Sequence, residues 1–247
     1  MSDIEQTNPL VEQLLQEAQE LDFSLTQDQA CSLVQHLELV IEKNKVMNLT
    51  RIVDEQDAVT KHLVDSLLFT MVAQEQDLPQ GEYLDIGTGA GFPGIPFAIT
   101  SGREGVLLDS VGKKVKAVQE FLTQLGLSHT VHAESDRVEA FAKEHPSEFV
   151  LVVARAVAQT NVLVEYAAPL LAKGGFLILS KGNISDDELQ DGQYAAKVCG
   201  MEYVSRETFE LPRDAGHREL LVFKKVKKPS IALPRKVGDA KHNPLCR

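Results

Sequence analysis

Apolar positions recur every three or four residues through the first eighty residues, which predicts helices that each bury one face. A first helix is expected around residues 10–21. A second follows Thr26, with Gln29 three positions later in a capping-box pattern. A third is expected over residues 54–71. Together they form a predicted N-terminal helical appendage, residues 1–80.

After this segment, short β-rich runs alternate with helical ones. The runs predict five strands, at residues 83–86, 106–108, 130–133, 149–154 and 176–180. Helical patterns lie between and after them, near residues 93–100, 112–125, 136–144, 158–172 and 185–199. The run 149–154 is apolar on both faces, which is typical of a central parallel strand. Two later runs, 202–205 and 220–223, are expected to close the sheet as an antiparallel edge.

This alternation predicts an α/β, Rossmann-like fold with a doubly wound, mostly parallel sheet, because a parallel pair needs a right-handed helical crossover. We expect the sheet domain to span residues 81–226. A basic C-terminal tail, residues 227–247, follows it.

Charge is distributed unevenly along this chain of 247 residues, whose formal net charge is −11. Residues 213–247 hold ten Lys or Arg against three Asp or Glu, so this segment carries +7 and residues 1–212 carry −18. A basic tail on an acidic body indicates contact with a polyanion, or a solvated segment that keeps the chain soluble. Pro229 and Pro234 discourage a helix there, and little apolar area is left to pack.

Several classes of protein are disfavoured by the sequence. Cys31, Cys199 and Cys246 lack the paired spacing of a zinc site or a disulfide framework. No apolar run approaches the roughly 18 residues of a membrane helix, and the acidic N-terminus lacks the apolar core of a signal peptide. We therefore expect a cytoplasmic protein with no metal and no membrane contact, and we expect a monomer.

The most informative segment is Leu84-Asp85-Ile86-Gly87-Thr88-Gly89-Ala90-Gly91, which follows a predicted strand and precedes a helix. Glycines there permit a tight turn and close approach of the backbone to a ligand. Gly89 to Gly94 also fits the dinucleotide fingerprint. However, Asp85 near the strand end suits a ligand's ammonium group and would repel a pyrophosphate. Asp109, at the end of the second strand, fits a ribose hydroxyl clamp with either ligand.

The pattern Asp-x-Gly-x-Gly-x-Gly resembles the first motif of class I S-adenosylmethionine-dependent methyltransferases. Further matches narrow the resemblance to the ribosomal RNA small subunit methyltransferase G family, also called glucose-inhibited division protein B. The matching stretches run in order over residues 45–245: Asn48-Leu49-Thr50, His62-Leu63-Val64-Asp65-Ser66, Asp85 to Pro96, Leu107-Leu108-Asp109-Ser110, Arg137-Val138-Glu139, Ala154-Arg155-Ala156, Lys181-Gly182 and Pro234-Arg235-Lys236-Val237-Gly238. In the tail, Asp239 interrupts the basic run and Cys246-Arg247 ends it, which departs from the pattern.

The resemblance implies a methyltransferase that uses S-adenosyl-L-methionine to methylate N7 of a guanine in 16S rRNA, with the small ribosomal subunit as partner. It implies a cofactor site made of eight residues: Asp85, Gly87, Gly89, Phe92, Asp109, Val138, Glu139 and Arg155. Val138 and Glu139 would lie against the adenine. Arg155 would contact the cofactor or the guanine, unless it only forms a structural ion pair at its strand end.

The residues alone narrow the kind of group that is methylated. The fourth predicted strand ends in Ala154-Arg155-Ala156-Val157, where amino-group methyltransferases often place Asn/Asp-Pro-Pro-Tyr/Phe, and no cysteine lies at a strand end to serve as a nucleophile. A ring nitrogen or a hydroxyl remains. Methylation of N7 needs alignment and no general base, so no catalytic residue is expected.

Three residues keep two interpretations each. His62 and Asp65 are three positions apart on one predicted helix, where they pair with each other or reach the RNA. Lys181 is a solvated cation or a phosphate contact. Two competing functions also stay open: a methyltransferase of another substrate, and a ribosome-binding or nucleotide-sensing protein without methyl chemistry.

Overall fold

The computed structural model describes residues 8–155 and 157–247. The acidic residues 1–7 and Ala156 of the motif after the fourth strand lie outside the described residues. The helices and strands are, in chain order, α1 Pro9–Glu20, α2 Gln27–Asn44, α3 Glu55–Ala58, η1 Val59–Val64, α4 Asp65–Gln74, β1 Tyr83–Ile86, α5 Gly94–Ser101, β2 Gly105–Asp109, α6 Gly112–Gln124, β3 Val131–Ser135, α7 Val138–Glu144, β4 Phe149–Arg155, α8 Thr160–Ala167, β5 Leu171–Lys181, α9 Asp186–Cys199, β6 Met201–Leu211, β7 Gly216–Lys225 and α10 Asp239–His242.

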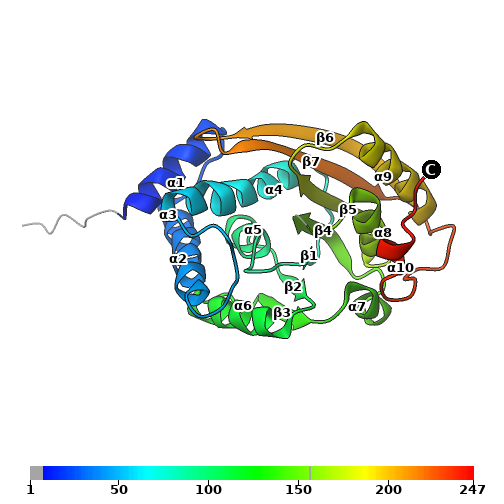
Figure 1. The fold of residues 1–247 in the computed structure, drawn as a ribbon, viewed down its shortest axis with the longest axis horizontal. Coiled ribbons are helices and arrows are strands. Elements are labelled where there is room, and N and C mark those ends of the chain that lie inside the picture. Colours follow the sequence, from blue (N-terminus) through cyan, green and yellow to red (C-terminus); the bar gives the residue numbers. More distant parts are fainter. Residues whose placement is uncertain (1–7, 156) are drawn as a thin grey trace, which may run out of the picture.

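The seven strands form one sheet in the order β3-β2-β1-β4-β5-β7-β6. Strands β1 to β5 pair in parallel, and β7 and β6 add an antiparallel edge. The order reverses between β1 and β4, which is the switch point where ligands bind in open α/β sheets. The predicted fold class is therefore confirmed (Figure 1).

Successive side chains of each central strand point to opposite faces of the sheet, and both faces are covered. Leu151 and Val153 of β4 pack into one apolar cluster with α1, α2, α4, α5 and α6, whereas Val152 and Ala154 pack with α8 and α9. Figure 1 shows the N-terminal helices and the group α7 to α10 at opposite ends of the molecule. The N-terminal helices share their core with the sheet, while the domain boundaries at residues 80 and 226 stay a prediction.

The predicted N-terminal helices are present. Thr26 caps α2 and forms the expected reciprocal pair with Gln29. The third predicted helix contains a feature that apolar spacing does not encode: six residues, Val59–Val64, form a π-helical segment between α3 and α4. Such a segment inserts an extra residue into the helical turn and changes which side chains share a face.

Several elements differ in length from the sequence-based expectation. The helix predicted over residues 158–172 ends at Ala167, because β5 begins at Leu171. Strands β6 and β7 have 11 and 10 residues, at least two and a half times the length of the runs that predicted them. Much of β6 alternates between exposed and partly buried residues, so polar side chains interrupt the apolar pattern along it.

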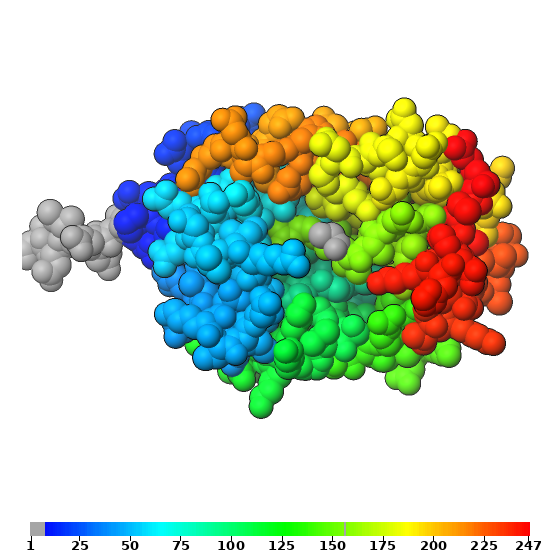
Figure 2. All heavy atoms as spheres, viewed as in Figure 1, coloured from blue at the N-terminus to red at the C-terminus, as the bar shows by residue number. Residues whose placement is uncertain are grey.

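The tail is folded, so the expectation that it has little to pack is wrong. It forms the short helix α10, in which Ala240 is buried. Two nitrogens of the Arg235 guanidinium donate to the Glu165 carboxylate, at 2.7 and 2.6 Å. Asn161 donates to the carbonyl of Leu245. In Figure 2 the tail, coloured red, lies against the body, and this face is hollowed between it and the N-terminal helices.

The described part of the chain has no helix long and apolar enough to span a bilayer. In the same residues, no three His, Cys, Asp or Glu side chains converge in the manner of metal ligands. Cys31 and Cys246 are exposed and Cys199 is buried, and all three are free thiols.

Candidate functional site

The glycine loop between β1 and α5 needs glycine for two distinct reasons. Gly87 has φ 75°, and a Cβ there would lie 2.6 Å from a methyl carbon of Val157. Gly89 has φ 62°, but the nearest atom to its Cβ position is 3.9 Å away. Both take the left-handed conformation that other residues rarely adopt. At Gly89 the backbone therefore faces open space, where a ligand can approach it.

Two carboxylates hold this loop in place. Asp85 of β1 accepts a hydrogen bond from the Gly94 amide at 2.9 Å. Asp109, the last residue of β2, accepts from the Gly89 amide at 3.0 Å and from the Val111 amide at 2.9 Å. The loop is thus fixed at both ends by strand-end carboxylates, which positions its backbone for a ligand.

Asp85 lies beneath the loop with no exposed surface. Its Oδ1 has no hydrogen-bond partner among the described residues, and burial raises the pKa of its carboxyl group to about 7. The structure therefore assigns Asp85 a loop-supporting role. The ammonium contact expected from the sequence stays a prediction.

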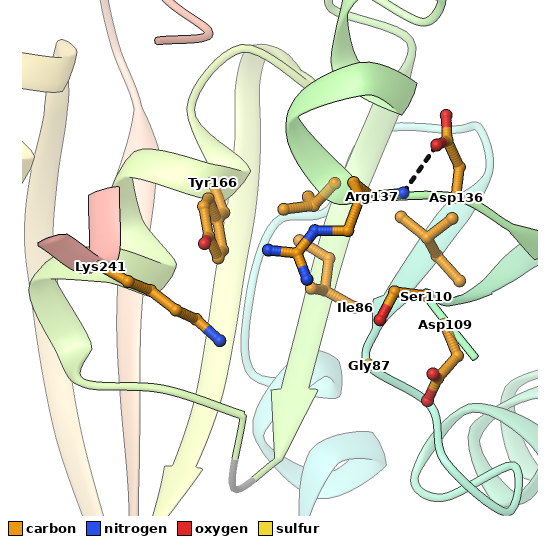
Figure 3. A pocket seen from close by; sticks show the side chains of 10 residues that line it. Ile86, Gly87, Asp109, Ser110, Asp136, Arg137, Tyr166 and Lys241 are labelled. Carbon is orange, nitrogen blue, oxygen red and sulfur yellow. Dashed lines mark hydrogen bonds between the residues drawn. The ribbon is translucent and has the colours of Figure 1, made fainter. Parts of the chain in front are cut away.

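Asp109 opens onto a cavity of about 150 Å³, here called the Asp109 cavity. Its lining residues come from the ends of β1 and β2, the β3–α7 turn, α8 and the tail: Ile86, Gly87, Leu108, Asp109, Ser110, Asp136, Arg137, Val138, Tyr166 and Lys241. Figure 3 shows Arg137 and Lys241 extending toward this space from opposite sides. The cavity has a carboxylate on one wall and apolar side chains on another.

Of the eight predicted site residues, Gly87, Asp109 and Val138 line this cavity, and Gly89 bonds to Asp109. Glu139 does not line it. Instead its Oε1 accepts from the Gly238 amide at 2.7 Å, which ties the tail to α7. Sequence reasoning missed four lining side chains in particular: Ser110, Arg137, Tyr166 and Lys241. The first two stand inside quoted motifs, whereas nothing local marks Tyr166 or Lys241.

Phe92 lies in a different place, at the centre of a ring cluster on the other side of the loop. The imidazole of His62 stacks on it with centroids 4.7 Å apart, and that of His36 lies 4.5 Å away. The guanidinium of Arg155 is 5.5 Å from the Phe92 centroid. Phe92 therefore connects the glycine loop to the N-terminal helices and to the end of β4.

The second cavity, here called the Arg155 cavity, has a volume of about 510 Å³. Its lining residues come from the N-terminal segment, the ends of β4 and β5, and β7: Ile52, Lys61, His62, Asp65, Arg155, Ser180, Lys181, Gly182 and Arg218. Four of them are cationic and one is a carboxylate, so the cavity has a net positive lining. It lies at the carboxyl ends of β4 and β5, beside the loop that bounds the Asp109 cavity.

Asp65 organises the cations of this cavity. Its two oxygens accept from Arg155 and Arg218, each at 2.9 Å, and its side chain is only 5% exposed. Asp65 and His62 do not pair with each other, so that expectation is wrong. The Nε2 of His62 instead lies 2.8 Å from the Thr50 hydroxyl. Burial and the nearby Arg155 charge lower the pKa of His62 to about 3.

Lys181 is not the freely solvated cation that one interpretation expected. Its ammonium group donates to the Ala158 carbonyl at 2.6 Å and lies 2.8 Å from the Glu188 carboxylate. Its side chain still lines the Arg155 cavity. The residue therefore bridges the end of β5 to the segment after β4, and its phosphate contact stays a prediction.

Comparison with known proteins identifies the family of this architecture. The sequence pattern of the family described as rRNA small subunit methyltransferase G matches residues 29–219. The chain is 38% identical to the ribosomal RNA small subunit methyltransferase G of Desulforamulus reducens over 242 residues, which covers 96% of this chain and 99% of that protein. It is 36% identical to the protein of the same name from Lactobacillus acidophilus, covering 95% and 98%.

Solved structures agree on the fold. A putative sarcosine dimethylglycine methyltransferase from Galdieria sulphuraria superposes with a TM-score of 0.53 at 14% identity, covering 71% of this chain and 89% of that one. At this identity the likeness concerns the fold alone, because one fold hosts many activities.

Proposed function

Since the chain belongs to the ribosomal RNA small subunit methyltransferase G family and is an S-adenosylmethionine-dependent rRNA methyltransferase, we propose that it methylates N7 of a guanine in 16S rRNA. One observation carries the choice of N7. The described residues that line the Arg155 cavity include four cations, one carboxylate and one imidazole, that of His62. Asp65 is bound to two arginines, and the lowered pKa of His62 makes it a very weak base.

An N7 target fits this lining. Guanine N7 has a lone pair in the plane of the ring and no proton, so attack needs alignment and no base. An amine or hydroxyl target would instead lose a proton, and a positioned base would accelerate that loss. The cavity supplies cations in place of a base, and lysines and arginines of this kind position RNA through its phosphates.

The Asp109 cavity fits the nucleoside part of S-adenosylmethionine. Each Asp109 oxygen already accepts one amide hydrogen, and each keeps a second lone pair for a ribose hydroxyl. The apolar side chains of Ile86, Leu108 and Val138 offer surfaces for a flat adenine. At Gly89 the open backbone leaves room for the rest of the cofactor. When bound, S-adenosylmethionine supplies the methyl group as a sulfonium.

The other predicted cofactor residues have supporting parts in this proposal. Asp85 supports the glycine loop by accepting a hydrogen bond from the Gly94 amide. Glu139 holds the tail by accepting one from the Gly238 amide. We place the boundary between the two cavities at Phe92 and Arg155, whose guanidinium lies 5.5 Å from the Phe92 ring, with Arg155 facing the incoming base or its phosphate. Because the methyl group has to pass from one cavity to the other, this boundary is the proposed place of transfer.

We also propose that the protein acts as a monomer on the small ribosomal subunit in the cytoplasm. Ribosomal RNA as substrate is consistent with that location.

The test is to map 16S rRNA by nuclease digestion and mass spectrometry from cells with and without the protein. We expect one guanine to lack a methyl group at N7 in its absence. Single-turnover transfer by the purified protein should also be nearly independent of pH between about 7 and 8.5, because no proton leaves N7. A tenfold rise per pH unit would indicate a base and favour an amine or hydroxyl target.

A further inference from the structure

A third cavity, here called the lysine cavity, opens at the opposite end of the sheet from the other two. It has a volume of about 770 Å³, within the range of small-molecule sites. Leu171, the first residue of β5, and Lys225, the last of the antiparallel β7, both line it. It therefore lies at the amino ends of the parallel strands, and neither the cofactor nor the target guanine of the proposed function occupies it.

The cavity combines an apolar floor with a cationic rim. Ala142, Ala168 and Leu171 are buried at its floor, and Leu233 of the tail is partly buried beside them. Five lysines from α7, β5, β7 and the tail line it: Lys143, Lys173, Lys225, Lys227 and Lys228. No Asp or Glu is among its described lining residues.

This single sign of charge is opposite to the composition of the chain. Asp and Glu outnumber Lys and Arg by 36 to 25, so a random patch of surface would be acidic. Here lysines from four separate segments converge without a carboxylate between them. Such a concentration of positive charge raises the local concentration of anions.

Lys225 adds an independent sign of an anionic ligand. It is 6% exposed, and its ammonium group donates to the Cys199 carbonyl at 2.8 Å. No described carboxylate lies within ion-pair distance of it, and burial lowers its pKa. A buried cation without a counter-ion is costly, and an anion that enters the cavity relieves this cost.

We propose that the lysine cavity binds the phosphate backbone of the RNA substrate, with an unstacked base on its apolar floor. This inference rests on the proposed function, since it adds a second contact for the same RNA. Ser147 is the one neutral hydrogen-bonding side chain among the described lining residues, and lysine ammonium groups only donate, so the amino groups of base edges find almost no acceptor here. Recognition of phosphate without recognition of sequence is typical of backbone contacts and favours a polymer over one particular nucleotide.

The experiment measures binding of 16S rRNA and of the small ribosomal subunit across a series of salt concentrations. The test variant is Lys227→Glu/Lys228→Glu, in which both changed residues are exposed on the cavity rim. The matched control is Lys116→Glu/Lys197→Glu, which makes the same change of charge at exposed lysines outside the three cavities. Both variants should bind S-adenosylmethionine as the unchanged protein does, which shows that they are folded.

We expect the slope of log affinity against log salt to become shallower by about 0.7 for each phosphate that the protein no longer neutralises, or about 1.4 for the test variant relative to the control. A second variant, Lys143→Glu/Lys173→Glu, changes lysines on separate segments of the rim and should show the same change of slope. It replaces the first variant in the experiment if that one does not fold. Equal slopes in test and control variants would overturn the proposal.

Uridine monophosphate distinguishes RNA from a free nucleotide, because it resembles neither the target guanine nor the adenosine of the cofactor. Tight binding of this nucleotide that is abolished in the test variant, with an unchanged RNA slope, would overturn RNA as the occupant. Mapping of the methylated position remains a separate measurement. A protein that fails to methylate N7 but shows the slope change would disprove the proposed function and leave the RNA contact standing.

Discussion

The two cavities at the carboxyl ends of the strands are built in opposite ways. Most of the Asp109 cavity comes from turns that directly follow β1, β2 and β3, and one short motif carries its glycines. The Arg155 cavity gathers residues from position 52 to position 218, including the π-helical segment and β7. The first is a local structure in which Asp109 bonds to the glycine loop, and the second is a long-range assembly of cations around Asp65.

This difference indicates which half of the site depends on the whole fold. A glycine loop keeps its shape through backbone hydrogen bonds to nearby strand ends, such as that from the Gly87 amide to the Leu108 carbonyl at 2.7 Å. The Arg155 cavity keeps its shape only while two arginines on different strands reach one buried carboxylate. Substitutions in the second cavity should therefore act on stability, and those in the first on cofactor binding.

The largest effect is expected from Asp65→Ala, which leaves Arg155 and Arg218 without their shared partner. Breaking a buried pair typically costs about 3–5 kcal/mol, because the remaining charges are left uncompensated. Asp65 is only 5% exposed, and the arginines are 15% and 21% exposed. The free energy of unfolding in urea should fall by an amount in this range.

Asp57→Ala is the matched control, because Asp57 also pairs with a cation, Lys61, but is 46% exposed. An exposed pair of this kind contributes little to stability, because water screens its charges. If both variants lose the same small amount of stability, Asp65 does not organise the cavity and the contrast between the two regions fails.

The next effect in size concerns the Asp109 cavity. Asp109→Ala removes a charged hydrogen-bond acceptor, which typically costs about 1.5–3 kcal/mol, or roughly ten- to a hundredfold in affinity for S-adenosylmethionine. Calorimetry measures that affinity, and thermal unfolding checks the fold. Asp136→Ala is the control, because Asp136 lines the same cavity but bonds to the Arg137 amide and not to the glycine loop. Equal affinity in Asp109→Ala and the unchanged protein would remove Asp109 from the cofactor site.

The same contrast between local and long-range structure explains which parts of the fold and of the site could be predicted from the sequence. Strand β1 matches its predicted bounds, and the glycine loop lies where its motif placed it, because both are encoded by consecutive residues. The Asp65–Arg218 pair joins residues 153 positions apart, and no periodicity or spacing relates them. The π-helical segment and the folded tail were missed for a related reason: both depend on packing partners and not on local pattern.

A smaller effect is expected beneath the loop, where the raised pKa of Asp85 makes stability depend on pH. Its folded-state pKa of about 7 lies above the ordinary value of 3.8, so the folded protein binds more protons between these limits. Stability from this group is therefore present at low pH and falls as pH rises toward 7, by up to about 1.4 kcal/mol per unit. In Asp85→Asn this contribution to the pH dependence of stability is absent, because an amide does not ionise in this range.

Urea unfolding of both proteins at pH 5 and pH 6 measures the effect. We expect the stability of Asp85→Asn relative to the unchanged protein to increase by about 1.4 kcal/mol over this step. Asp57→Asn is the control: the neighbouring Lys61 lowers the pKa of Asp57, so its carboxylate is ionised at both pH values and no relative change should appear. A parallel pH dependence of Asp85→Asn and the unchanged protein would show that Asp85 is ionised in its buried place.

The smallest effect tests whether the Asp109 cavity is as local as its motif suggests, because Lys241 of the tail also lines it. Arg235 fixes the tail through two hydrogen bonds to Glu165, a carboxylate only 4% exposed. Arg235→Lys keeps the charge but removes the bidentate geometry, a change of about 1 kcal/mol. We expect affinity for S-adenosylmethionine to fall by roughly fivefold, with faster dissociation of the cofactor in stopped-flow measurements.

Lys236→Arg, the converse exchange at the exposed neighbouring position, should leave both quantities unchanged. Were Arg235→Lys to bind the cofactor like the Lys236 control, the cavity would depend on the glycine loop and its strands alone.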